Sequence, residues 1–91
     1  MKYEITPSNR FKKDVRVAHK RGYDLRLLTD VILKLANGEK LDAKYKDHAL
    51  SGDYADFREC HITSDWLLIY QFVDDELILY LSRTGTHSDL F

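Results

Sequence analysis

The chain has 91 residues, which is enough for one domain with a hydrophobic core but too few for two. We therefore expect residues 1–91 to form a single domain. The hydrophobic share of 44% and the charged share of 32% are typical of a globular protein and exclude a disordered chain. The longest apolar run is about as long as a strand, so no helical membrane span is predicted. Residues 1–10 lack the apolar block of a secretory signal, and we expect a cytoplasmic protein.

The net charge of −1 hides an uneven distribution along the chain. Residues 1–46 carry twelve Lys or Arg and six Asp or Glu, a balance of +6, whereas residues 47–91 carry two and nine, a balance of −7. Such a polarised chain favours a basic surface that binds polyanions. The alternative is that the charged residues form an ordinary solvent-exposed helix face without a binding role. The single cysteine, Cys60, excludes an intramolecular disulfide and is expected to be a small buried hydrophobe.

The N-terminal half predicts a short strand over residues 3–5 and then two helices. Ser8 offers a cap for a helix that begins near Asn9 and ends before Gly22, and Asp24 can cap a second helix that stops at residues 37–38. The apolar stripes expected to face a sheet are Phe11, Val15 and Ala18 in the first helix, and Leu25, Leu28, Ile32 and Leu35, widened by Leu27 and Val31, in the second. The first helix is strongly basic through Arg10, Lys12, Lys13, Arg16, Lys20 and Arg21.

The C-terminal half predicts an antiparallel meander. A polar loop over residues 39–46 leads to a short strand over 47–50 and a turn over 51–53. Strands over residues 57–62 and 66–73 follow, joined by a hairpin connection over 63–65. A second turn over 74–75 leads to the last strand, over 76–82. The predicted fold class is α+β, with two N-terminal helices packed on one face of a small twisted, mainly antiparallel sheet.

The hairpin over residues 57–72 combines the strongest core signal with the densest set of titratable residues. Alternate residues of a strand share a face, so Glu59 and His61 point one way while Cys60 and Ile62 point the other. A carboxylate and an imidazole therefore lie side by side, about 7 Å apart along the strand. Asp65 lies at the turn beside them.

Three of the four histidines lie near predicted strand ends in the C-terminal half, each with a carboxylate close in sequence: His48, His61 and His87. Histidine exchanges protons near neutral pH, so three around one sheet would suit general acid–base catalysis. The alternative for each is an ordinary surface or capped histidine. Because no HExxH or paired-cysteine spacing is present, we expect no metal site.

Two further residues are candidates for contacts with a nucleic acid. Arg83, at the end of the last strand, could hold a phosphate and stabilise developing charge, or it could pair with a C-terminal carboxylate. Phe91, the last residue, could stack on an unpaired base or fold back onto the core. Trp66 is expected to pack in the core rather than line a site.

Four ordered segments, YKDHALSG, FRECH, SDWLLIYQF and SRTGTHSDLF, resemble the signature blocks of the YafQ branch of the RelE/ParE toxin superfamily. These proteins are bacterial ribonucleases of type II toxin–antitoxin modules. The resemblance runs from the basic helix to the last residue, and it implies two helices on a small antiparallel sheet. The chain departs from many members at Glu59, where they have Asp, and at Ala49, where they have Pro, so the resemblance carries no catalytic assignment to Glu59.

The resemblance implies cleavage of messenger RNA in the decoding site of a translating ribosome, without a metal or another cofactor. We expect His61 and His87 to transfer protons, with His48 and Asp65 as orienting or assisting groups. Two further positions match the family's contacts with RNA: Arg83 would contact the scissile phosphate, and Phe91 would contact a base. Lys44 and Lys46, with the basic helix, would contact RNA and phosphate.

The same resemblance implies a protein partner. A free ribonuclease would harm its host, so we expect a cognate antitoxin, two toxins with two antitoxins in one complex, and binding to promoter DNA only through the antitoxin. The alternatives are a non-catalytic toxin that poisons DNA gyrase, as the ParE branch does, and an inactive partner-binding module.

Overall fold

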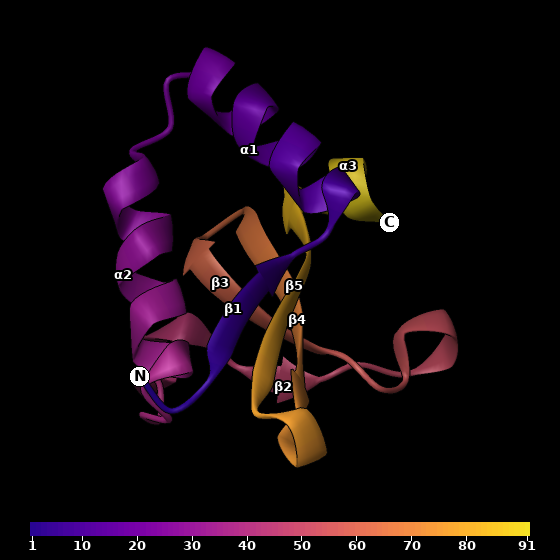
Figure 1. Ribbon diagram of the computed structural model, residues 1–91. Helices are drawn as coiled ribbons and strands as arrows, with labels where there is room; N and C mark the ends of the chain where they lie inside the picture. The colour runs from indigo at the N-terminus through magenta and orange to yellow at the C-terminus, as the bar shows by residue number, and fades with distance from the viewer.

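The computed structural model describes residues 1–91 and consists of two long helices against one side of a five-stranded sheet (Figure 1). Its elements in chain order are β1 (Glu4–Pro7), α1 (Asn9–Lys20), α2 (Leu25–Ala36), β2 (His48–Ala49), β3 (Arg58–Thr63), β4 (Trp66–Val73), β5 (Ile78–Gly85) and α3 (His87–Leu90). Three single-turn 3-10 helices join them, η1 (Ala43–Tyr45), η2 (Gly52–Tyr54) and η3 (Asp74–Glu76). None of the helices has both the length and the apolar character that crossing a membrane requires.

The two long helices begin and end where their capping residues predict. The Ser8 hydroxyl accepts a hydrogen bond from the Phe11 amide, and the Asp24 carboxylate accepts one from the Arg26 amide. Gly22 follows α1 with a φ of 80°, a left-handed conformation that glycine adopts without the steric penalty of a side chain. Capping therefore confirms the two predicted helices.

The sheet has the order β1-β5-β4-β3-β2, and β4 is its centre. The β2–β3, β3–β4 and β4–β5 pairs are antiparallel, while β1 runs parallel to β5. The parallel pair arises because α1 and α2 lie between β1 and the meander, so the chain crosses over before it returns to the sheet. The predicted α+β fold with a mainly antiparallel sheet is confirmed.

The main core fills the space between the helices and one face of the sheet. Its best-buried members are Leu28, Val31, Leu35 and Ala36 from α2, with Cys60, Leu68, Tyr70, Leu79 and Leu81 from the strands. Trp66 belongs to this core, where its indole N–H donates to the Thr84 hydroxyl at 2.9 Å. Cys60 is fully buried, and burial raises the pKa of its thiol to about 12, so its expected role is confirmed.

Some boundaries and one helix face differ from prediction. Leu27 was expected in the apolar stripe of α2, but its side chain is 43% exposed because α2 turns Leu28 and Val31 toward the sheet. The last strand was expected to stop at residue 82, yet β5 continues to Gly85 because pairing with β4 extends it. The strand expected at residues 3–5 lies at Glu4–Pro7, where it pairs with β5. The short helix α3 was not foreseen.

Candidate active site

The sheet face away from α1 and α2 holds a small apolar cluster and the histidines predicted for the site. Leu67, Ile69 and Leu90 are buried there, with partly buried neighbours from η2 and the loops around it. Strand pairing sets the order of the polar residues. His48 on β2 pairs with Glu59 on β3, which is followed two residues later on the same face by His61.

His48 stands at one end of this row. Its Nδ1 donates to the Lys46 carbonyl at 2.6 Å, which leaves Nε2 directed to the Glu59 carboxylate at 3.6 Å. The preceding residue, Asp47, accepts hydrogen bonds from the Tyr70 hydroxyl at 2.5 Å and the Arg58 guanidinium at 3.3 Å. The strand is only two residues long, and these bonds hold it in place.

Glu59 and His61 form the centre of the row. One Glu59 carboxylate oxygen lies 3.5 Å from Nε2 of His61 and 3.6 Å from Nε2 of His48, so one carboxylate lies between two imidazoles. The Glu59 side chain is only 6% exposed and that of His61 is 16% exposed. Nδ1 of His61 points to the Ser64 carbonyl at 3.4 Å. The carboxylate therefore faces Nε2 of both rings, while backbone carbonyls lie at their Nδ1 atoms.

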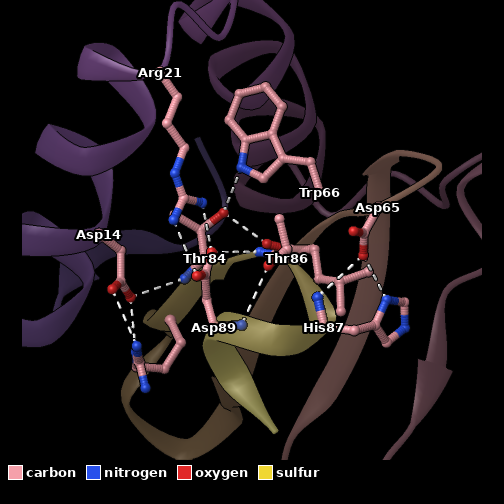
Figure 2. A network of polar contacts seen from close by, with 10 residues as sticks. Asp14, Arg21, Asp65, Trp66, Thr84, Thr86, His87 and Asp89 are labelled. Carbon is pink, nitrogen blue, oxygen red and sulfur yellow. Dashed lines mark hydrogen bonds and ion pairs between the residues drawn. The ribbon is translucent and has the colours of Figure 1, made fainter.

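His87 approaches His61 from the other side of the row. Figure 2 shows Asp65 beside His87, and the Asp65 carboxylate accepts from Nδ1 of His87 at 2.7 Å and from its backbone amide at 3.1 Å. The hydrogen bond from the His87 ring, followed by the one from its amide, lowers the pKa of Asp65. The ring centroids of His61 and His87 are 5.8 Å apart, and those of His48 and His61 are 6.5 Å apart. The predicted residues His48, His61, Asp65 and His87 therefore meet on one face.

The short helix α3 carries His87, and a clasp holds α3 to the rest of the molecule. Thr86 and Asp89 form a reciprocal capping box, and Arg21 at the end of α1 grips the Asp89 carboxylate with two bonds of 2.6 and 3.1 Å (Figure 2). The hydrogen bonds from Arg21 are the main reason why the pKa of Asp89 is lowered. A side chain at Gly85 would place its Cβ 2.9 Å from Asp89, so only glycine permits this close return of the chain.

Arg83 does not point freely into the row of histidines. Its Nε and Nη2 donate to the Asp14 carboxylate of α1 at 2.7 and 3.1 Å, and this bond raises the pKa of Arg83. Asp14 also accepts from the Thr84 amide at 3.1 Å. The partner lies in the N-terminal helix, so the alternative of a C-terminal carboxylate was wrong. Nη1 has no bond to Asp14.

The residues expected to contact RNA lie in three places: Phe91 beside His87, Lys44 and Lys46 next to His61 at the η1 turn, and the cations of α1 on the helix side of the sheet. Phe91 is 63% exposed, with its ring edge-on to Tyr54 at 5.8 Å and 6.4 Å from the His87 ring. Lys44 lies within η1 and Lys46 directly after it, two residues before His48, and both are exposed. The exposed cations of α1 that make no ion pair, the basic face, are Arg10, Lys12, Lys13, Arg16 and Lys20.

The arrangement also gathers donors that suit a metal ion. One ligand atom each from Glu59, His61 and His87 lies within 4.8 Å of the other two. Two imidazoles and a carboxylate are the donor types that zinc and copper accept in proteins. The spacing of these residues in the sequence matches none of the common metal motifs, because pairing between strands rather than one helix brings them together.

Sequence reasoning left two parts of the site out. Glu59 was not included among the predicted site residues, although its alternation with His61 placed it on the same face. The clasp was missed as well, yet Thr86 followed by Asp89 has the spacing of a capping box and could have predicted α3. Arg21 carries no such signal, because its bond to Asp89 spans 68 residues.

Comparisons with known proteins agree on the class. A family model described as bacterial toxin of type II toxin-antitoxin system, YafQ, matches residues 3–91. The mRNA interferase toxin YafQ of Escherichia coli K12 is 40% identical over 89 residues, which cover 97% of this chain and 95% of the relative. Fold and site therefore define a bacterial toxin of a type II toxin–antitoxin system. The chain belongs to the YafQ family of these toxins, which confirms the resemblance.

Solved structures match over the whole chain. The crystal structure of a metal-bound toxin from Helicobacter pylori has a TM-score of 0.92 and 47% identity, covering 98% of this chain and 99% of the other. The E. coli DinJ-YafQ toxin-antitoxin complex has a TM-score of 0.89 and 39% identity, covering 100% of this chain and 99% of the other.

Proposed function

We propose that this toxin is an endoribonuclease that cleaves messenger RNA. The observation that carries the proposal is the pair of oriented imidazoles, His61 beside Glu59 and His87 beside Asp65, with ring centroids 5.8 Å apart on an open face. The ribose and its phosphate would lie across the exposed edges of both rings. The printed activity of the E. coli relative, mRNA interferase, supports the same substrate class.

The reaction needs one proton acceptor and one proton donor. The acceptor takes the proton of the ribose 2′-hydroxyl, whose oxygen attacks the adjacent phosphorus while the bond from phosphorus to the 5′-oxygen breaks. The donor protonates that departing oxygen, so the products are a 2′,3′-cyclic phosphate and a 5′-hydroxyl. We assign His61 and His87 to these two transfers, which positioned side chains accelerate by roughly 10²- to 10⁴-fold each.

The hydrogen bonds prepare both rings for this chemistry. Because Asp65 accepts from Nδ1 of His87, Nε2 of that ring is left to meet the substrate. Glu59 lies at Nε2 of His61, where it stabilises the imidazolium that forms when this ring holds a proton. His48 completes the row and assists through the same carboxylate.

Arg83 is the group that we assign to the charge on the phosphate. Asp14 takes the N–H of Nε and one of Nη2, so Nη1 and the second N–H of Nη2 are left for a phosphate oxygen. The bond to Asp14 then acts as a positioning contact that holds the guanidinium plane.

We further propose that cleavage takes place in the ribosomal A site. The unpaired cations of the basic face suit the phosphates of ribosomal RNA, and Lys44 and Lys46 suit an RNA phosphate near His61. Phe91 presents an exposed ring next to His87, where it can stack on a base of the messenger. Such a target places the toxin in the cytoplasm.

A cognate antitoxin would neutralise this activity. The E. coli relative is seen in complex with DinJ, and an acidic antitoxin segment would complement the basic face here. We propose a complex of two toxins and two antitoxins that binds promoter DNA only through the antitoxin. A toxin whose melting temperature does not change when the neighbouring gene product is added would contradict this.

The proton transfers that we assign require no metal, because imidazoles and carboxylates supply both of them. Glu59, His61 and His87 nevertheless fit zinc or copper, and a toxin similar to this chain is described as metal-bound. Such an ion, when bound, would act as a Lewis acid. It would also take the imidazole lone pairs that proton transfer uses, so we propose that a metal here inhibits.

The test uses purified toxin, programmed ribosomes and an mRNA with a sulfur atom in place of the 5′-oxygen at the cut. Sulfur leaves without protonation, so the substitution restores the rate of a variant that lacks the acid, but not of one that lacks the base. We expect one of His61→Ala and His87→Ala to be rescued and the other not. Intact mRNA with the wild-type toxin would refute the proposal, and growth arrest with DNA damage would favour gyrase poisoning.

A further inference from the structure

A groove lies directly beside the row of histidines, on the side of α2. It has a volume of about 420 Å³ and is lined by α2, η1 and the end of β3, including His61. This volume lies within the range of small-ligand sites, roughly 300–1,000 Å³. The groove shares His61 with the proposed active site, and Ser64, which also lines it, accepts the hydrogen bond from that ring through its carbonyl. Whatever enters the groove therefore lies next to His61.

The charge of the groove is wholly positive. Lys44 and Lys46 line it, both are exposed, neither takes part in an ion pair, and no acidic residue lines the groove. Two free ammonium groups in one recess attract a phosphate. The backbone of Lys46 is held in place, because its amide donates to the Ala43 carbonyl at 3.0 Å and its own carbonyl accepts from His48 at 2.6 Å. The Lys46 side chain therefore starts from a fixed point beside the catalytic row.

The remaining walls are apolar and aromatic. Leu27 lies here, which accounts for a leucine of α2 that is turned away from the main core. The Tyr45 ring packs partly against that core, and the ammonium groups of Lys34 and Lys44 lie 5.9 and 5.1 Å from its centroid. A ring, a leucine and two cations together suit the flat apolar base and the charged phosphate of a nucleotide.

We infer that this groove binds the nucleotide next to the scissile phosphate in the substrate RNA, with its phosphate on Lys44 and Lys46 and its base against Tyr45 and Leu27. The inference rests on the proposed ribonuclease function, because it takes the scissile phosphate to lie against both His61 and His87. It gives the toxin a way to hold the RNA on one side of the cut. Phe91 offers the corresponding contact on the other side.

The first experiment compares three lysine variants of the full chain in cleavage on programmed ribosomes. Lys46→Asn removes the charge and keeps the left-handed backbone, φ 50°, that asparagine tolerates. Lys46→Arg keeps the charge, and Lys40→Gln removes a charge from the same loop outside the groove. We expect Lys46→Asn to raise KM on the order of tenfold with little change in kcat, as expected for loss of a charged hydrogen bond. Lys40→Gln should match the wild type, and Lys46→Arg, which keeps the charge, should raise KM less than Lys46→Asn does.

The second experiment locates the nucleotide. An mRNA with a 2′-deoxyribose at the cut, which cannot be cleaved, carries 4-thiouridine at single positions on either side. After irradiation on ribosomes, we expect Tyr45 to crosslink from one adjacent position only, and less in Lys46→Asn. Crosslinks that fall elsewhere from every position would overturn the inference. So would a Lys46→Asn variant that loses affinity for antitoxin while KM stays unchanged, because the groove would then belong to that protein.

The two proposals fail in different ways. If the wild-type toxin leaves ordinary mRNA intact on the same ribosomes, the ribonuclease proposal fails. If it cleaves, but Lys46→Asn and Lys40→Gln behave alike and Tyr45 does not crosslink, only the groove inference fails.

Discussion

The two faces of the sheet use the same strands for opposite purposes. On one face α1 and α2 cover a core of fifteen buried residues, and on the other three buried residues support an open row of imidazoles and carboxylates. Adjacent residues of β4 illustrate the contrast, since Leu68 belongs to the covered core and Leu67 to the small cluster under the row. One face supplies most of the folding free energy, and the other is left open to a substrate.

The contrast between the two faces explains why the site can contain a buried carboxylate. Glu59 is almost fully buried, and an unpaired carboxylate at such depth is costly. Nε2 atoms of two imidazoles lie 3.5 and 3.6 Å from one Glu59 oxygen, so a proton on either ring would give the carboxylate a charged partner. The rigid covered face keeps β3 in place, so the row on the other face stays ordered without a cover of its own.

Replacing His87 is expected to have the largest effect. His87→Ala should lower the cleavage rate on programmed ribosomes by about 10²- to 10⁴-fold, because it removes one proton transfer. The side chain is 55% exposed, so the melting temperature by circular dichroism should hardly change. His19→Ala, which removes an exposed histidine of α1, is the matched control and should cleave at the wild-type rate. Equal losses in both variants would contradict a specific site on the open face.

Saturating zinc is expected to lower the cleavage rate about as strongly as His87→Ala does. The ion would occupy nitrogen atoms of His61 and His87, and with them both proton transfers. Titration of Zn²⁺ into the cleavage assay, followed by EDTA, should abolish and then restore the activity. Calorimetry with Glu59→Gln should show weaker binding, because a charged ligand is lost. Full activity at saturating zinc would place the metal elsewhere.

Shortening a leucine of the covered face should chiefly affect stability. Leu68→Ala is expected to lower the free energy of unfolding by about 2–5 kcal/mol, since it leaves a cavity in a closely packed core. Leu67→Ala should lie near the lower end of that range, because the partly exposed neighbours of the small cluster can relax into the space. Urea denaturation measures both. A larger loss at Leu67 would reverse the assignment of the two faces.

Opening the clasp on α3 should affect activity more than stability. Arg21→Ala releases Asp89, and we expect a fall in kcat on the order of tenfold, less than the roughly 10²-fold that a misplacement of 1 Å can cost. The loss of stability should be small, because exposed ion pairs contribute little. Arg21→Lys, which keeps the charge but not the two-point grip, should fall between. A change in KM alone would mean that Arg21 contacts RNA instead.

The smallest expected effect is on the free energy of unfolding at acidic pH. His87 lowers the pKa of Asp65 in the folded state, so the unfolded chain takes up this proton first as pH falls. The pair therefore contributes its full stability above about pH 4, the ordinary range of aspartate, and loses it as pH falls through the lower folded value. The difference in unfolding free energy between wild type and Asp65→Asn should shrink below pH 4. A difference that grows in acid would contradict the bond.

Local signals were sufficient for much of the fold. Ser8 and Asp24 marked the starts of both helices because capping depends on residues within one turn. The alternation in residues 57–62 placed Glu59 and His61 on one face and Cys60 and Ile62 on the other, because a strand has a period of two. The exposed Leu27 was not foreseen, since periodicity shows which residues share a helix face but not which face the sheet covers.

The amino-acid sequence by itself determined the two helices, the meander, the face shared by Glu59 and His61, and the identities of the catalytic candidates. Only the tertiary structure decided that His48 and His87 join that face, that Asp14 holds Arg83, and that Arg21 clasps α3. The reason is physical: caps and alternation act within a few residues, whereas these contacts depend on strand register and helix docking across tens of residues.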